Sequence, residues 1–375
     1  MATFNYDING ACEAMIAQAK DYAGRNYPGP GGLGRSVGAL DFITSPTNGS
    51  IKTELNTGSQ GKKLKRARVF YKQRTKPCEI LTGSTAKASA LCDTPVEAEE
   101  KEVTVEITGR VATTPRAFSN TKMVTICQDT KQFVDEFLMS DMRALRETVS
   151  EQVLALMAAD AGVIIHQDGT TDTPAGSYKS KKLLATDANG QKIPLTGNYN
   201  DILMDYQNMQ FQGLPALIGQ GNLQTYFQLA GLACCNSATP YGDALSRAGA
   251  AFFLDQAANN ILGDAGNRFL MAAFGISHLL WFNENANIDI NTDVYKHIVI
   301  QDPVYPALKW DVDFKWDPCN TLGKVWLYQI SAYYDVFNLI QADSFANYTS
   351  PDPSPTCVDE LYGVTGIWGY KATAA

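Results

Sequence analysis

The sequence predicts an α+β protein with one long helix and a set of strands that alternate apolar with polar residues. The helix is predicted between Asp129 and Gly162, where apolar residues recur at steps of three and four and so share one side. The apolar positions are Val134, Leu138, Met142, Leu145, Val149, Val153 and Leu156. The strands are predicted from strict alternation near the other end of the chain, where Trp310, Val312, Phe314 and Trp316 are separated by Asp311, Asp313 and Lys315.

Length and composition permit a sizeable core. The chain has 375 residues, of which 45% are hydrophobic and 19% charged. No apolar run approaches the roughly 18 residues of a membrane span. Residues 1–10 lack a basic region followed by an apolar one, so no secretory signal is expected. The eight cysteines are scattered without a CxxC pair, which favours free thiols.

Charge is distributed unevenly along the chain. Residues 1–91 hold 13 Lys and Arg against 6 Asp and Glu, a balance of +7. The remainder therefore holds 18 against 33, a balance of −15, and the sum is the net charge of −8. A chain with oppositely charged parts can attract copies of itself, and a basic segment can also contact nucleic acid.

Residues 1–61 are predicted to form an N-terminal arm. A short helix is expected at 9–22, followed by a segment rich in Gly and Pro. Residues 43–59 continue in turn formers and Thr, which is typical of an extended, poorly packed segment.

Residues 62–118 are predicted to form a long two-armed hairpin. Residues 62–76 carry eight basic residues and no acid, whereas residues 102–111 alternate apolar with polar side chains and follow further glutamates. The charged residues of the two arms could face each other across the ladder or face a neighbouring copy. These candidate intersubunit contacts are Arg66, Arg68, Lys72 and Arg74 on the first arm and Glu97, Glu99, Glu100, Glu102 and Glu106 on the second.

The alternative function for residues 62–76 is nucleic-acid binding, with Phe70 and Tyr71 stacking on bases. The acidic second arm is so close in sequence that a charged, solvated hairpin is favoured.

The long helix, expected at 130–161, belongs to a segment 119–195 that continues as a polar connection after residue 166. Residues 196–288 read as a compact module: a helix from Asn200 that buries Ile202, Tyr206 and Met209, a buried strand at 214–218, and a second helix from Asn222. Gly275 interrupts the apolar run 269–282.

Residues 289–343 are predicted to be mostly strands, at 297–301, 308–316 and 324–339. Residues 344–375 are predicted to be a C-terminal tail, which begins as a Pro, Ser and Asp loop and ends with Trp368 and Tyr370.

The sequence contains no pattern that marks a catalytic, cofactor or metal site. None of His166, His278 and His297 has a ligand partner at a fixed short spacing, and His278 lies in an apolar run, which favours a core histidine. No nucleophile elbow, Walker A or zinc-protease motif occurs. We therefore expect a protein that is not an enzyme and has no cofactor.

The order of these elements resembles the Hong Kong 97-type major capsid protein of tailed double-stranded DNA bacteriophages. The resemblance covers residues 39–339 and rests on the order of the predicted elements and on the residue pattern within each of them. It implies an α+β fold with an N-arm, an extended hairpin (E-loop) at 62–118, a peripheral (P) domain with a long spine helix over a β-sheet, and an axial (A) domain at 196–288.

The resemblance implies a shell protein that assembles into hexamers and pentamers of an icosahedral phage head around double-stranded DNA. Expected partners are further copies of the chain, a separate scaffolding protein, a portal, decoration proteins and DNA as non-specific content, with no membrane; its place would be the virion. The alternatives are an encapsulin-type shell and a soluble nucleic-acid-binding protein that uses residues 62–76.

Overall fold

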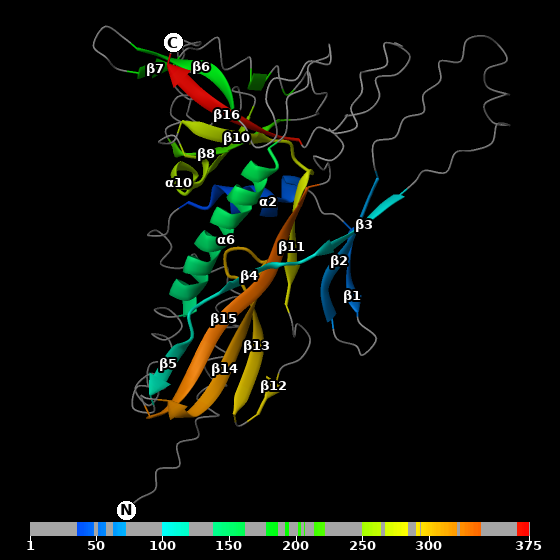
Figure 1. The fold of residues 1–375 in the computed structure, drawn as a ribbon, viewed down its shortest axis with the longest axis vertical. Coiled ribbons are helices and arrows are strands. Elements are labelled where there is room, and N and C mark those ends of the chain that lie inside the picture. The colour runs from blue at the N-terminus through cyan, green and yellow to red at the C-terminus, as the bar shows by residue number, and fades with distance from the viewer. Residues whose placement is uncertain are drawn as a thin grey trace, which may run out of the picture.

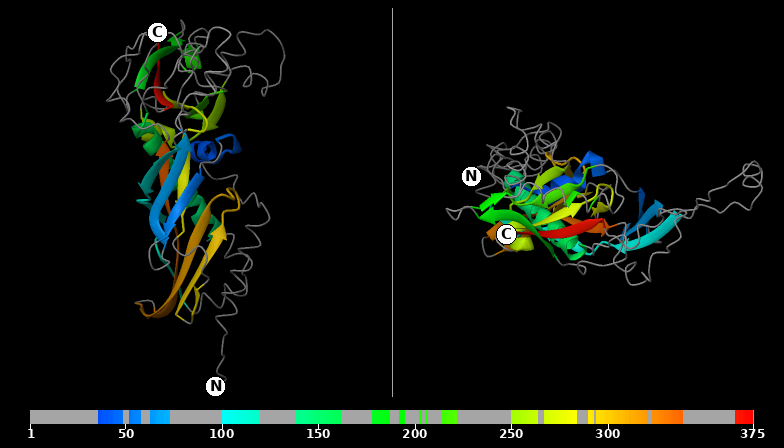
Figure 2. Two further views of the ribbon diagram at one scale, coloured as in Figure 1. Left: turned by 90° about the vertical axis from the view of Figure 1, so that its right-hand side faces the viewer. Right: turned by 90° about the horizontal axis from the view of Figure 1, so that it is seen from above.

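The part of the chain that the computed structural model describes contains three β-sheets and one long helix. The structure describes residues 36–48, 52–57, 63–72, 100–119, 138–161, 178–186, 192–194, 202–203, 206, 214–221, 250–263, 267–283, 290–292, 294–320, 323–338 and 366–374. Along the long axis, a six-stranded sheet lies at one end and a seven-stranded sheet at the other (Figures 1 and 2). A three-stranded sheet stands beside the seven-stranded one (Figure 1). No helix of the described residues is both long and apolar enough to cross a bilayer.

The seven-stranded sheet is built around its longest strand. Its members are β4 (Gly109–Ala112), β5 (Arg116–Ser119), β11 (Ser277–Phe282), β12 (Ile290–Asn291), β13 (Tyr295–Gln301), β14 (Lys309–Asn320) and β15 (Gly323–Asn338). Because β15 has 16 residues, it pairs with β14 and β11 in succession on one edge and with β5 and β4 on the other. The three strands predicted at 297–301, 308–316 and 324–339 are confirmed as β13, β14 and β15.

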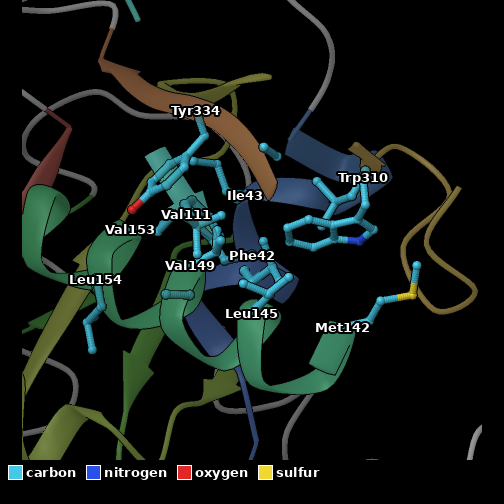
Figure 3. Close-up of a cluster of buried hydrophobic side chains, with 14 of the residues drawn as sticks. Phe42, Ile43, Val111, Met142, Leu145, Val149, Val153, Leu154, Trp310 and Tyr334 are labelled. Atoms are coloured by element: carbon cyan, nitrogen blue, oxygen red, sulfur yellow. The ribbon is translucent and has the colours of Figure 1, made fainter. Parts of the chain in front are cut away.

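The long helix α6 (Met139–Ala159) packs on this sheet. Its 21 residues give a rod of about 32 Å. Figure 3 shows Met142, Leu145, Val149 and Val153 of α6 beside side chains from other elements, Trp310 among them. Each fully buried side chain of this size contributes about 1.5–3 kcal/mol by leaving water, so the apolar stripe holds the helix on the sheet.

The prediction for this helix is confirmed in type and partly corrected in detail. Residues 120–137, which include the predicted start of the helix, lie outside the described residues, and so does Gly162. The helix ends at Ala159 rather than at 161. Leu156 was expected in the buried stripe but is 39% exposed, whereas Leu154 is fully buried. The buried face extends to that side because the short helix α10 (Ala258–Leu262) packs against α6.

Polar side chains fix α6 along its length. Asp141, near its start, accepts hydrogen bonds from Arg116 on β5 and Tyr328 on β15. Arg146, one turn later, forms an ion pair with Asp302, with a shortest N–O distance of 2.9 Å. At the other end Asp160 accepts a hydrogen bond from Asn338. These contacts set the register of the helix on the sheet.

A buried carboxylate also ties α6 to the N-terminal part of the chain. Asp255 accepts hydrogen bonds from Ser150 Oγ (2.7 Å) on α6 and from the backbone N–H of Ala39 (3.1 Å). Ala39 lies in the first turn of α2 (Gly38–Thr44), where backbone N–H groups have no partner within the helix. The interpretation of residues 43–59 as poorly packed is therefore wrong at its start: α2 is buried, and Ile43 is only 5% exposed.

In the six-stranded sheet, the last strand of the chain lies in a central position. Its order is β7-β6-β16-β10-β8-β9, and its strands are β6 (Tyr178–Thr186), β7 (Lys192–Pro194), β8 (Ala216–Gly219), β9 (Ala251–Leu254), β10 (Arg268–Ala272) and β16 (Ile367–Ala374). The prediction of a tail is wrong for β16, since Trp368 and Tyr370 are at most 1% exposed. The polar connection after residue 166 likewise contains β6 and β7.

The predicted module 196–288 is only partly reproduced as a unit. The buried strand is confirmed as β8, and Ile202 and Tyr206 are buried as predicted, although Leu214 is half exposed. Gly275 takes a φ of +82° in the turn between β10 and β11, which confirms the expected break. However, β11 pairs with β15 and so belongs to the seven-stranded sheet. Met209 and the helix expected from Asn222 lie outside the described residues.

Candidate assembly surface

The three-stranded sheet carries the charged residues that the sequence singled out. It consists of β1 (Lys52–Thr57), β2 (Lys63–Lys72) and β3 (Glu100–Glu106), paired antiparallel in the order β1-β2-β3. The predicted pairing of a basic with an acidic arm is present as β2 with β3. The first strand, β1, comes from the segment expected to be an arm, so the hairpin has a third member.

The outer face of this sheet is a charged ladder. Arg66 lies directly opposite Glu106, and its Nη2 is 2.5 Å from Glu106 Oε1. Arg68 reaches diagonally to Glu102, with Nε 3.1 Å from Oε1. The sequence allowed these four residues either to pair across the ladder or to face a neighbouring copy. Within this chain they pair across the ladder.

These ion pairs contribute little to the stability of the subunit. The four side chains are 44–60% exposed, and pairs in such surroundings are worth about 0.2–1 kcal/mol, less at high salt. The ladder is therefore accessible, and its energy is small enough for a partner to rearrange it.

The inner face of the same sheet is apolar and docks on the subunit itself. Ala67 and Val69 of β2 are at most 1% exposed and lie opposite Val105 and Val103 of β3. With Ile107 they pack against a cluster on β11 and β15, formed by Leu280, Phe282 and Phe337. One face of the hairpin is thus buried within its own subunit, and only the other is open to a neighbour.

The junction between β3 and β4 fixes the direction in which the hairpin leaves the body. A Cβ atom at Gly109 would lie 2.5 Å from the carbonyl oxygen of Tyr334, so this close approach of two backbones requires glycine. Thr108 donates two long hydrogen bonds of 3.4 Å to Asp335, and the Arg110 guanidinium lies 5.4 Å from the ring centre of Tyr333. Sequence reasoning missed these residues because their partners lie more than 200 positions away.

The remaining candidate contacts are less completely placed. Lys72 and Glu100 lie opposite each other in the register of β2 and β3. Arg74, Glu97 and Glu99 lie outside the described residues. The hairpin was expected to reach residue 118, but residues 109–112 and 116–119 pair with β15 as β4 and β5. Contacts of all nine residues with a neighbouring copy remain a prediction.

A cluster of ionisable side chains around the buried His297 lies on the seven-stranded sheet. His297 Nδ1 is 2.7 Å from Asp313 Oδ1, its Nε2 is 3.5 Å from Asp311 Oδ1, and Tyr295 OH donates to Asp313. Burial alone would raise the pKa of Asp313, but the hydrogen bonds from His297 and Tyr295 and the charge of Arg110 bring that pKa below its usual value. His297 is only 1% exposed and Asp311 only 3%, whereas the Asp313 side chain is 29% exposed. The imidazole is therefore enclosed within the subunit.

The other histidine on a described strand is a core residue, as predicted. His278 is 7% exposed and its Nε2 is 3.1 Å from the carbonyl oxygen of Gly275. Burial lowers its pKa, which favours the neutral ring. Within the described residues, no three His, Cys, Asp or Glu side chains are arranged to hold a metal ion.

No family model and no curated protein matches this chain. Among solved structures, a chain of Mycobacterium phage Che8 is 9% identical, with 87% of this chain and 93% of that chain covered and a TM-score of 0.39. The capsid of Myoviridae phage XM1 gives 11% identity, 88% and 92% coverage and a TM-score of 0.39. A virus-like particle from Pyrococcus furiosus gives 10%, 74% and 83%, and 0.34. TM-scores in this range do not establish a common fold, and the function proposed below rests on the geometry of this chain.

Proposed function

We propose that this chain is a major capsid protein of the Hong Kong 97 type, which assembles as hexamers and pentamers into an icosahedral phage head around double-stranded DNA. In this proposal α6 on the seven-stranded sheet forms the peripheral domain, the six-stranded sheet the axial domain, and β2 with β3 the base of the E-loop. The role is structural, the protein resides in the virion, and a separate scaffolding protein, a portal and decoration proteins are its further partners.

The observation that carries the proposal is the two-faced sheet β1-β2-β3. Its apolar face anchors it to β11 and β15, and its charged face, with Arg66, Arg68, Glu102 and Glu106, remains exposed. An arm that is fixed at its base and open on its outer side is suited to lie against an identical neighbour. Many such contacts in a closed shell give stability by summation even though each is weak.

The anchoring of α6 supports the same proposal. Carboxylates of Asp141, Asp302 and Asp255 connect the helix to three separate parts of the fold. A subunit that is braced in this way keeps its shape, and a constant shape is what repeated, closed contacts require.

The alternative of a nucleic-acid binder that uses residues 62–76 is less well supported. Arg66 and Arg68 are already paired with Glu106 and Glu102, and these carboxylates would repel a phosphate backbone. An encapsulin-type shell would use the same surface and would differ in its contents.

Electron microscopy of the purified full-length chain tests the proposal, first alone and then with a candidate scaffolding protein. We expect six-fold and five-fold rings or closed shells. The charged face of the three-stranded sheet β1-β2-β3, called the hairpin sheet from here on, should lie against a neighbouring subunit. Particles that stay monomeric at neutral pH under both conditions would contradict the proposal. Nucleic acid or protein found inside the shells distinguishes a phage head from an encapsulin-type shell.

A further inference from the structure

We propose that one face of the six-stranded sheet, centred on Arg268, Lys371 and Lys182, binds the phosphate backbone of double-stranded DNA. We call this set of residues, with the hydroxyl groups of Tyr178, Ser180 and Thr373, the cationic face. The inference rests on the proposed function for the identity of the polyanion, and it names the surface at which the subunit would contact it.

The charge of this sheet is opposite to that of the whole chain. Its six strands contain six basic residues and no acidic one, although the chain as a whole has a net charge of −8. The basic residues are Lys179, Lys181, Lys182, Lys192, Arg268 and Lys371. The strands of the seven-stranded sheet, in contrast, mix both signs, with Asp311, Asp313, Asp317 and Asp335 among them. A positive region in an acidic protein concentrates its attraction for polyanions at one place.

Strand register places Arg268, Lys371 and Lys182 on one face of the sheet, whereas Lys179 and Lys181 lie on the other. Arg268 of β10 lies opposite Lys371 of β16, and Lys371 lies opposite Ser180 of β6. Two residues further along β16 and β6, Thr373 lies opposite Lys182. Directly opposite residues share a face, and so do residues two apart on one strand. Three cations and the hydroxyl groups of Ser180 and Thr373 therefore lie together on one face of β10, β16 and β6.

Arg268 is held in position by its surroundings. Its Nη1 donates to the carbonyl oxygen of Leu262 (2.9 Å), at the end of α10, and its guanidinium lies 4.6 Å from the ring centre of Tyr178. Lys182 is exposed, and Lys371, directly opposite Arg268, is half-buried. Both lysines take part in interactions within the chain, so a phosphate would compete with partners that they already have.

The chemistry of this face favours phosphate over the carboxylates of a second copy. Arginine, lysine and hydroxyl side chains together are the groups that contact the DNA backbone, and they do so without reading sequence. The face offers donors of all three kinds. We therefore expect binding that does not depend on base sequence and that weakens steeply with salt.

The test measures binding of the full-length chain to a labelled duplex of about 30 base pairs by fluorescence anisotropy, from about 50 to about 200 mM salt. The test variant is Lys182→Gln with Lys371→Gln. The matched control is Arg66→Gln with Arg68→Gln, which removes the same charge from the hairpin sheet. Sedimentation of each variant reports assembly separately.

For the test variant we expect affinity to fall at least about tenfold at about 0.1 M salt, and the slope of log affinity against log salt to become shallower by about 2. The control should keep the wild-type affinity. The inference would be overturned if the wild type did not bind DNA, or if both variants lost affinity equally. It would also be overturned if the test variant changed sedimentation but kept its DNA affinity, and that result would assign the face to a subunit contact. Shell formation is scored apart from DNA binding, so failure of the proposed function is distinguishable from failure of this inference.

Discussion

Two of the arginine–carboxylate pairs in the described residues share their chemistry and differ in their surroundings. Arg146 and Asp302 connect α6 to the loop between β13 and β14, and their side chains are 12% and 0% exposed. Arg66 and Glu106 connect two strands of the hairpin sheet, and theirs are 52% and 60% exposed. The first pair is part of the fold, and the second lies on a surface that is available to a neighbour.

The difference arises from what else each carboxylate binds. Asp302 also accepts hydrogen bonds from Trp310 Nε1 (2.9 Å) and from the backbone N–H groups of Val304 and Tyr305. Removing it would leave several buried donors without an acceptor, one of them charged. Glu106 is surrounded by water, which replaces any partner that is lost. Burial therefore decides which pair determines stability.

The largest effect is expected for Asp302→Ala. We expect the free energy of unfolding to fall by about 3–5 kcal/mol, because the substitution leaves Arg146 as a buried, unpaired cation. Urea denaturation followed by circular dichroism measures this. The matched control is Glu106→Ala, which removes a carboxylate from the exposed pair and should cost about 1 kcal/mol or less. Equal losses in the two variants would show that the comparison of the two pairs is mistaken.

A smaller effect of opposite sign is expected at Lys296 on β13. Its side chain is 1% exposed, and its Nζ has no hydrogen-bond partner within the part of the chain that the structure describes. Lys296→Met keeps the length of the side chain and removes the buried amine, so the free energy of unfolding should rise by about 1–3 kcal/mol. Lys309→Met, at an exposed position of the neighbouring strand β14, is the control and should bring no gain. A loss of stability in Lys296→Met would show that the amine has a stabilising role.

A further prediction uses the pH dependence of the Asp313 carboxylate. Its pKa is lowered in the folded state, since hydrogen bonds from His297 and Tyr295 outweigh the effect of burial. A lowered pKa contributes stability above the pKa of the unfolded chain, about 3.9, and this contribution is lost as pH falls through the folded value. Asp313→Asn should therefore be less stable than wild type at about pH 5, and the difference should shrink towards about pH 3. Thermal unfolding at both pH values measures it, and a difference that grows on acidification would contradict the assignment.

The sequence predicted elements whose burial follows a regular pattern, and it did not predict contacts between individual residues that are distant in the chain. The stripe of α6 and the alternation of β14 and β15 were readable because one face of each element is buried and the other is not. In β16, Ile367, Trp368 and Tyr370 are buried on both faces, so no alternation marks the strand, and its neighbours β6 and β10 come from distant parts of the chain.

The polar residues of the core were not predictable from local patterns. Asp311 continues the alternation of β14 and was expected on the polar side, yet it is 3% exposed beside His297. Asp141 and Ser150 occupy helix positions that periodicity alone leaves undecided, and their partners Tyr328 and Asp255 are more than 100 residues away. For the candidate assembly surface, the sequence predicted the opposing charges of β2 and β3. It did not predict the apolar docking of Val69 on Phe337 and its neighbours, because that contact joins two separate sheets.

The smallest change in the stability of the subunit is expected for substitutions in the charged ladder, where the proposed effect on assembly is largest. Glu102→Lys with Glu106→Lys reverses the acidic half of the exposed ladder, so Arg66 and Arg68 lose their partners. Because all four side chains stay in water, the free energy of unfolding should change by about 1–2 kcal/mol or less. A surface that meets copies of itself cannot tolerate such a reversal, because like charges at a contact repel and cost specificity.

We therefore expect the reversed variant to fold normally by circular dichroism but to give no rings or shells by electron microscopy. Arg66→Glu with Arg68→Glu, combined with the first two changes, swaps the signs of these four residues and restores their pairs within the subunit. If the ladder acts only within the subunit, this fourfold variant should assemble like the wild type. If the ladder instead contacts other charged residues of a neighbouring subunit, which the variant leaves unchanged, the fourfold variant should remain unassembled although its own ion pairs are intact. That outcome would place the charged face of β2 and β3 at the contact between subunits.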